Sequence, residues 1–186
     1  MAKPDQLYFI TGNAGKFREI QAVIPNILQL ELDVDEIQSL DPQAVIEHKL
    51  AQAAALHDGQ FIVEDTSVVL DCIAPLPGTL IKWFEKSLGA AGVADLVLRY
   101  DAHGAHVTTT IGYRDSAGRT SFFKAGYRGT IVPPKGINGF GFDPVFIAEG
   151  QSKTNAELTP DEKNAFSARG KAARQLVDHL NKFAVS

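Results

Sequence analysis

A short β-favouring run that turns directly into a helical pattern constrains this chain more than any other stretch of its sequence. The stretch is LYFITGNAGKFREI, residues 7–20, in which the apolar run 7–10 is followed by two glycines, an asparagine and a lysine. Asn13 can cap a helix whose apolar stripe consists of Phe17, Ile20 and Ile24. A strand that passes through so short a turn into a helix is typical of proteins that cover a sheet with helices.

The rest of the chain first continues this alternation and then changes its period. The predicted strands are 6–11, 27–34, 61–63, 105–114, 120–131 and 144–148, and the predicted helices are 13–24, 42–57, one that ends near 88, 92–100, one that starts at 159, and 168–183. Residues 105–131 are typical of a hairpin around the turn 115–118. This order predicts an α/β fold: one domain over residues 1–186, with a mixed sheet and helices on its faces.

Composition and charge exclude several classes of function. The net charge is −4 and no run of Lys or Arg exceeds two residues, so the chain lacks the basic stripe that a nucleic-acid backbone requires. The single cysteine, Cys72, excludes an internal disulfide and fits a reducing compartment. No run approaches the roughly 20 apolar residues that span a bilayer. We therefore expect a cytoplasmic protein without nucleic-acid or membrane partners.

The opening turn has the physical properties of an anion site. The start of a helix leaves backbone N–H groups unpaired and carries the positive end of the helix dipole, to which Lys16 adds a full charge. It is not a P-loop, because Ile10 stands where that motif has glycine and Phe17 where it has Ser or Thr. The alternative interpretation is an ordinary strand-to-helix turn with a surface lysine.

Acidic residues follow the predicted strands and suggest a metal. Glu64 and Asp65 come directly after the apolar run 61–63, and Glu36 lies in a polar turn after the second predicted strand. Ligand sites of open α/β sheets lie at the carboxyl ends of strands, and carboxylate oxygens beside a phosphate site suit Mg²⁺. The alternative is that these acids cap the helices that follow.

Two downstream segments carry further candidates. In GFGFDPVF, residues 139–146, Phe140 or Phe142 could stack on a nucleotide base and Asp143 could hydrogen-bond its edge; the alternative is a rigid aromatic turn. In EKNAFSARGKA, residues 162–172, Lys163 and Arg169 could reach a phosphate and a base, or could form a surface charge pair.

Taken together, these segments resemble a known enzyme family. TGNAGK, VEDTS followed by LPGTLIKWF, GFGFDPVF and EKNAFSARGKA occur in the order found in the Ham1-type inosine/xanthosine triphosphate pyrophosphatases, over about residues 7–180. The resemblance implies an elongated mixed sheet flanked by helices, two lobes with a central cleft, and a homodimer. It also implies Mg²⁺-dependent hydrolysis of non-standard purine nucleoside triphosphates (ITP, dITP and XTP) to the monophosphate and pyrophosphate.

The resemblance also implies roles for individual residues. The implied substrate-binding residues are Thr11, Gly12, Asn13, Lys16, Lys49, Thr66, Lys82, Phe140, Phe142, Asp143, Lys163 and Arg169. The implied metal ligands are Glu36, Asp65 and Glu64, and the implied catalytic residues are Asp65, as general base, and Lys16. Arg169 would lie near the 6-oxygen of the purine.

One departure from the family pattern concerns base selection. The family's last motif reads Ser-His-Arg, with the histidine on the base side, whereas this chain has Ser167-Ala168-Arg169. We therefore expect the phosphate chemistry to be retained with weaker discrimination between bases. Three alternatives stay open: the same chemistry with an altered base preference, a nucleotide-binding module without catalysis, and a Maf-type pyrophosphatase, whose serine- and arginine-containing opening block is not found here.

Overall fold

The computed structural model describes residues 6–184 of the 186-residue chain and is built on one mixed sheet. Within those residues the sheet has seven strands in the order β2-β1-β3-β5-β6-β7, with β4 paired to β3. The strands are β1 (Tyr8–Ile10), β2 (Leu28–Leu30), β3 (Phe61–Leu70), β4 (Pro77–Gly78), β5 (Gly104–Arg114), β6 (Thr120–Ile131) and β7 (Phe146–Ala148). β1 is parallel to β2 and β3, and the other pairs are antiparallel. The predicted mixed α/β sheet is confirmed.

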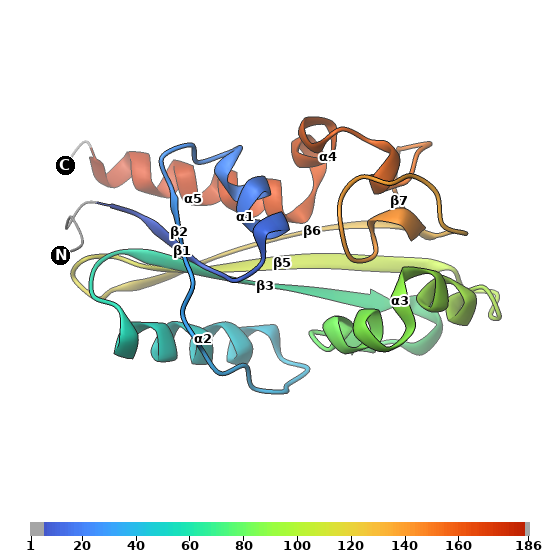
Figure 1. Ribbon diagram of the computed structural model, residues 1–186, viewed down its shortest axis with the longest axis horizontal. Coiled ribbons are helices and arrows are strands. Elements are labelled where there is room, and N and C mark those ends of the chain that lie inside the picture. Colours follow the sequence, from blue (N-terminus) through green and yellow to red (C-terminus); the bar gives the residue numbers. More distant parts are fainter. Residues whose placement is uncertain (1–5, 185–186) are drawn as a thin grey trace.

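Helices cover both faces of this sheet (Figure 1). They are α1 (Ala14–Gln21), α2 (Pro42–Leu56), α3 (Ile81–Val97), α4 (Pro160–Phe166) and α5 (Ala168–Ala184). Figure 1 shows α1, α4 and α5 on one face and α2 and α3 on the other. None of the helices within residues 6–184 is long and apolar enough to cross a membrane.

The helix boundaries follow the predicted signals closely. Asn13, Asp41 and Thr159 cap α1, α2 and α4 with their side chains, and Thr159 forms a capping box with Glu162. The two helices predicted on either side of residue 90 form one element, α3, which is broken at Gly89, where φ is +67°. A positive φ interrupts the regular helix without ending it, because glycine tolerates this conformation.

Two strands differ from their predicted lengths. The second strand, predicted over 27–34, covers only Leu28–Leu30, because it pairs with just the three residues of β1. The strand predicted over 61–63 continues to Leu70, because β5 pairs with it from Phe61 to Leu70. The prediction that Glu64 and Asp65 follow the end of this strand was therefore wrong. They lie in its middle, beyond the point where the neighbouring β1 stops.

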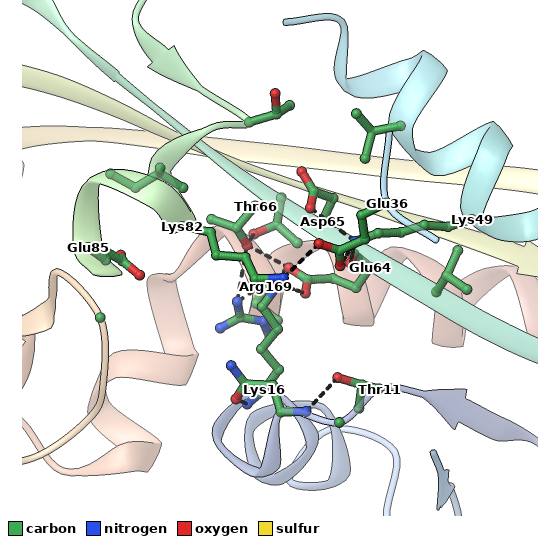
Figure 2. Close-up of a pocket in the computed structure, with 18 of the residues that line it drawn as sticks. Thr11, Lys16, Glu36, Lys49, Glu64, Asp65, Thr66, Lys82, Glu85 and Arg169 are labelled. Atoms are coloured by element: carbon green, nitrogen blue, oxygen red, sulfur yellow. Dashed lines mark hydrogen bonds and ion pairs between the residues drawn. The ribbon is translucent and has the colours of Figure 1, made fainter. Parts of the chain in front are cut away.

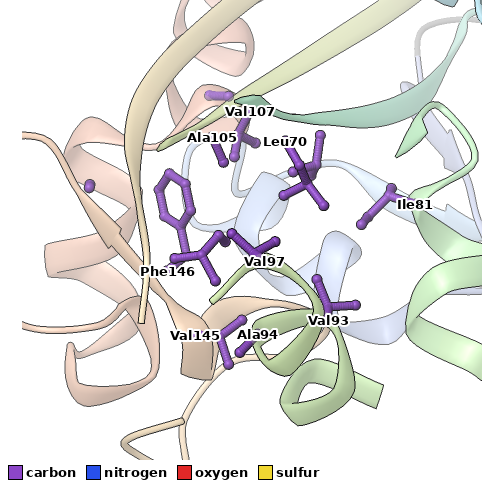
Figure 3. Close-up of a cluster of buried hydrophobic side chains, with 13 residues drawn as sticks. Leu70, Ile81, Val93, Ala94, Val97, Ala105, Val107, Val145 and Phe146 are labelled. Atoms are coloured by element: carbon purple, nitrogen blue, oxygen red, sulfur yellow. The ribbon is translucent and has the colours of Figure 1, made fainter. Parts of the chain in front are cut away.

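The apolar core is divided between the two ends of the long strands. Cluster 1 lies where β3, β5, β6 and β7 meet α3; Figure 3 shows Leu70, Val97, Val107 and Phe146 within it. At the other end, cluster 2 joins α1 and α5 to the sheet through Ile20, Leu176 and their neighbours, and cluster 3 joins α2 to the opposite face. Burial at both ends holds the middle of β3 in place, where the polar residues lie.

Candidate active site

One cavity of about 920 Å³ brings together all the site residues predicted from the sequence, from Thr11 to Arg169. Its walls come from the start of α1, the segment between β2 and α2, the middle of β3, the start of α3, the loop 139–143 and the α4–α5 junction. This volume lies in the range of small-molecule sites. Segments far apart in the sequence therefore form one binding space between the two ends of the sheet.

The start of α1 forms one wall of the cavity. Thr11 Oγ1 accepts a hydrogen bond from the backbone N–H of Asn13 at 3.1 Å, and Asn13 Oδ1 accepts one from the backbone N–H of Lys16 at 3.0 Å. These bonds hold the turn in one conformation. Lys16 Nζ then reaches across to Glu64 Oε2, 2.8 Å away (Figure 2). The predicted anion-binding turn thus faces the carboxylates of β3.

Glu64 is a fully ionised carboxylate whose oxygens are already engaged. Its Oε1 accepts from Thr66 Oγ1 at 2.6 Å and lies 3.3 Å from Arg169 Nη2, while Oε2 pairs with Lys16. Burial alone would raise its pKa, but the charges of Arg169 and Lys16 outweigh burial and lower it to about 2. Glu64 therefore neutralises two cations from opposite sides of the cavity, and its role as a metal ligand stays a prediction.

Asp65, the next residue, has a different environment. Its Oδ1 lies 3.2 Å from Lys49 Nζ, whereas its buried Oδ2 has no hydrogen-bond partner among residues 6–184. Burial raises the pKa of the Asp65 carboxyl, and the attraction of Lys49 only partly offsets this. A partly buried carboxylate with a raised pKa and one unpaired oxygen has the properties of a general base or a metal ligand.

Glu36 joins two lysines at the mouth of the cavity. Its Oε1 lies 3.0 Å from Lys49 Nζ and its Oε2 lies 2.8 Å from Lys82 Nζ (Figure 2). Burial would raise its pKa, but these lysines lower it to about 2. Glu36 belongs to the segment 31–41, which a hydrogen bond of 2.7 Å from Trp83 Nε1 to Gln38 Oε1 ties to α3.

Carboxylate oxygens are suitable ligands for a divalent cation, but the carboxylates of this cavity do not converge on one point. Lys49 Nζ lies between Glu36 and Asp65, and the unpaired oxygen of Asp65 is a hard donor of the kind Mg²⁺ prefers. Nowhere in residues 6–184 do three or more His, Cys, Asp or Glu side chains form a ready cluster for a metal ion. The expectation that three carboxylates gather at one point is therefore not met in this arrangement, in which lysines separate them.

At the other end of the cavity, which we call the aromatic end, the ring of Phe140 lies against two cations. The ring centroid of Phe140 is 4.9 Å from Lys163 Nζ and 5.5 Å from Arg169 Cζ. A Cβ atom on Gly15 would lie only 2.6 Å from this ring, so glycine at that position allows α1 to approach it. GFGFDPVF and EKNAFSARGKA, each predicted to contribute to the site, are thus in direct contact with each other.

Glu19, on α1, is the site residue that the sequence analysis missed. Its carboxylate accepts from Lys163 Nζ at 2.7 Å through Oε1 and from Arg169 Nη1 through Oε2. Burial would raise the pKa of Glu19, but Arg169 and Lys163 hold it below its ordinary value. The available signal was its spacing: Glu19 follows Lys16 by three residues and so lies on the same face of the helix.

Two predicted base contacts have a second task in the structure. Asp143 and Phe142 both line the cavity. However, Asp143 is buried, and its Oδ2 accepts from Lys163 Nζ at 2.6 Å and from the backbone N–H of Phe140 at 2.9 Å. Phe142 packs edge-on against the core residue Phe146. Asp143 therefore positions the loop and Lys163, and its carboxylate is committed to the protein.

The junction of α4 and α5 is built from small residues. Ser167 Oγ accepts from the backbone N–H of Gly170 at 3.1 Å, which caps α5. Ala168 is 1% exposed and belongs to cluster 1. Its methyl group has no hydrogen-bonding atom. In the first turn of α5, polar groups therefore come to the cavity only from the neighbours of Ala168.

The comparison with known families agrees with this geometry. The sequence profile of the Ham1 family matches residues 7–179, which is nearly the whole chain. The chain belongs to the Ham1 family. It is 38% identical over 190 residues to the inosine triphosphate pyrophosphatase of Kluyveromyces lactis, covering 97% of both chains, and 36% identical to that of Saccharomyces cerevisiae, covering 95% and 96%.

Solved structures share the fold of this Ham1 chain. A HAM1 protein from Coxiella burnetii superposes with a TM-score of 0.76 at 23% identity, covering 95% of this chain and 98% of that one. A nucleoside-triphosphatase, dITP/XTP pyrophosphatase, from Mycobacterium abscessus gives a TM-score of 0.66 at 25% identity, covering 92% and 98%. The cavity therefore lies in a fold that other Ham1 proteins share.

Proposed function

We propose that this Ham1 protein hydrolyses the non-standard purine nucleoside triphosphates ITP, dITP and XTP to the monophosphate and pyrophosphate. The observation that carries the proposal is one cavity lined by Lys16, Lys49 and Lys82 together with a partly buried aspartate, Asp65, whose Oδ2 is buried and has no partner among the described residues. The lysines supply charge for a triphosphate and Asp65 supplies a base. The names of the two yeast relatives support the same substrate class.

The reaction follows from the positions of these groups. Lys16, Lys49 and Lys82 bind the triphosphate, whose oxygens replace the carboxylates as their partners. Asp65 orients a water molecule and takes its proton as the water oxygen attacks the α-phosphorus. The bond from that phosphorus to the bridging oxygen breaks, and pyrophosphate leaves with charge that the lysines and the start of α1 stabilise.

A divalent cation completes the charge balance, and we propose Mg²⁺. Glu36 and Asp65 would hold it, because binding of phosphate by Lys49 releases the carboxylate oxygens that now face its ammonium group. When bound, the ion would polarise the phosphate oxygens as a Lewis acid. The cations and anions of the cavity neutralise one another without ligand and exchange partners together when a metal–nucleotide complex enters.

Base selection depends on Arg169 in this proposal. A 6-oxo purine offers a hydrogen-bond acceptor where adenine offers a donor, so a guanidinium group aimed there favours hypoxanthine and xanthine. Leaving such a charged donor unpaired costs roughly 1–3 kcal/mol or more. Arg169 Nε is buried and has no partner among the described residues, which supports this role.

Ala168 favours a variant of this function with weaker base discrimination. Its buried methyl group cannot contact a base as an imidazole would. We therefore expect turnover of ITP and XTP together with a measurable rate on GTP. If Ala168→His left the ratio of ITP to GTP turnover unchanged, the alanine would not be the cause.

The test is pyrophosphate release with Mg²⁺ from ITP, XTP, dITP, ATP, GTP and dTTP at equal concentrations and slightly alkaline pH. Fast turnover of ITP, dITP and XTP supports the proposal. Comparable rates on GTP or dTTP would support the same chemistry with another base preference. Binding without release from any nucleotide would support the non-catalytic alternative and contradict the proposed reaction.

Two further features belong to the proposal. A homodimer is implied by the resemblance alone, and light scattering combined with size-exclusion chromatography tests it: a monomeric mass at micromolar concentration would contradict it. The cytoplasmic location stays a prediction from composition.

A further inference from the structure

Tyr127, on β6, lines the cavity, and the mechanism above does not use it. Its ring packs edge-on against Phe146 and Phe166, with centroid separations of 5.3 and 5.9 Å. It also packs against cluster 1, which contains Ala168. These contacts give the side chain one defined position on the cavity wall.

The hydrogen bonds around the Tyr127 hydroxyl determine what it can offer a ligand. Asn155 Nδ2 lies 3.1 Å from Tyr127 Oη and 3.3 Å from Asp143 Oδ1. Because a carboxylate only accepts, the atom facing Asp143 is the amide nitrogen, and the same nitrogen donates to the tyrosine oxygen. Tyr127 is therefore the acceptor in this contact. No residue within 6–184 accepts its own O–H proton.

The surroundings keep this hydroxyl a donor. A tyrosine hydroxyl is protonated at neutral pH already at its ordinary pKa, and burial raises the pKa of Tyr127 further. Asn155 does not line the cavity whereas Tyr127 does, and the bond from Asn155 uses the oxygen of the hydroxyl as an acceptor, so its O–H proton is not committed to Asn155. Ala168, in the cluster against which Tyr127 packs, offers only a methyl group, whereas Tyr127 brings a hydroxyl to the residues that line the cavity.

We propose that Tyr127 is a specificity-determining residue whose hydroxyl donates a hydrogen bond to a carbonyl oxygen of the purine base. The inference rests on the proposed function and deepens it. Hypoxanthine carries one such oxygen, at C6, and xanthine carries two, at C2 and C6. An amino group in the same place would bring two donors together, so the contact disfavours adenine if it reads C6 and guanine if it reads C2.

The test separates base contact from catalysis by measuring binding of products. Calorimetry with Mg²⁺ gives the affinities of IMP, XMP and pyrophosphate for the native chain, Tyr127→Phe and the control Tyr113→Phe. Phenylalanine keeps the ring contacts of Tyr127 and removes only the hydroxyl. Tyr113 loses a comparable hydrogen bond, 2.9 Å to Gln60, away from the cavity.

We expect Tyr127→Phe to bind XMP about tenfold more weakly, with pyrophosphate binding unchanged and Tyr113→Phe like the native chain. An equal loss for IMP assigns the contact to the 6-oxygen, and a loss for XMP alone assigns it to the 2-oxygen; both support the inference. Unchanged binding of both monophosphates, or an equal loss for pyrophosphate, overturns it. A native chain that binds neither monophosphate overturns the proposed function and this inference with it, before any variant is compared.

Discussion

Asp65 is the residue on which the proposed reaction depends most directly. Asp65→Asn keeps the size of the side chain but removes the proton acceptor. Loss of general-base assistance alone costs typically about 10²–10⁴ in rate, so we expect kcat for ITP to fall by at least that order. Asp95→Asn, an exposed acid-to-amide change on α3, is the matched control. Near-normal turnover of Asp65→Asn would remove this residue from the mechanism.

Glu19 should matter for stability because it neutralises two buried cations. In Glu19→Gln the amide keeps the shape, but Lys163 and Arg169 lose their counter-charge. Removing one partner of a buried ion pair typically costs about 3–5 kcal/mol. We expect the free energy of unfolding to fall by an amount of that order at pH 7, measured by urea denaturation. Glu31→Gln, at an exposed site, serves as control.

The stability difference between the native chain and Glu19→Gln should also depend on pH in a defined direction. The pKa of Glu19 is lowered in the folded state from an ordinary value of 4.5, so its stabilisation is fully present above that value. It is lost as the pH falls through the lowered folded pKa. The difference between the native chain and Glu19→Gln should therefore shrink below about pH 4.5. A difference that stays constant down to pH 3 would show that Glu19 acts through packing and not through charge.

For individual residues, the sequence predicted which side chains come together in the cavity but not which of them form ion pairs with one another. The predicted lysines, carboxylates and aromatic residues all line one cavity, because motif order reflects the fold. The sequence did not reveal that Glu19 belongs to the site, nor that Asp143 accepts a hydrogen bond from Lys163. These partners lie 144 residues apart in the first case and 20 in the second, so both pairings depend on tertiary structure, which local pattern does not encode.

At the scale of elements, the contact between α4 and α5 sets the positions of Lys163 and Arg169. A Cβ atom on Gly170 would overlap the backbone carbonyl oxygen of Asn164. Gly170→Ala therefore forces the two helices apart, and such overpacking typically costs about 1–3 kcal/mol. We expect a lower thermal midpoint and a raised KM for ITP. Asn181→Ala, exposed on the same helix, should leave both unchanged; a Gly170→Ala enzyme with native values would contradict this account.

For the two hairpin strands, local sequence pattern was enough to predict the strand boundaries. The hairpin strands were predicted at 105–114 and 120–131 and lie at 104–114 and 120–131, since alternation and a clear turn define them. β3 was predicted too short because two acids follow its apolar run. Those acids are tolerated inside a sheet only because Lys16, Lys49 and Arg169 reach them from other elements.

At the scale of the whole molecule, the proposed function predicts that binding of the metal and binding of the anion are coupled. Without ligand, its lysines and carboxylates neutralise one another, so either ion alone would leave its opposite charges without partners. We expect Mg²⁺ with pyrophosphate to raise the thermal midpoint by roughly 5–10 °C at a hundredfold excess over Kd. The shift should exceed the sum of the shifts from each ion alone, measured by thermal denaturation. Simple additivity would show that the two sites are independent.

The backbone around Asp65 and the backbone around Glu36 should differ in how fast they open locally. Residues 64–66 of β3 are paired with β5 on one side, in the middle of a long ladder, whereas Glu36 lies on a segment, 31–41, that belongs to no helix or strand. Those amide hydrogens of residues 64–66 that point toward β5 should exchange with deuterium over hours, and those around Glu36 within seconds. In the proposed cation site Asp65 would thus be held by a strand and Glu36 by a loop, so we expect Glu36 to adjust to ions of different radius while Asp65 keeps its position.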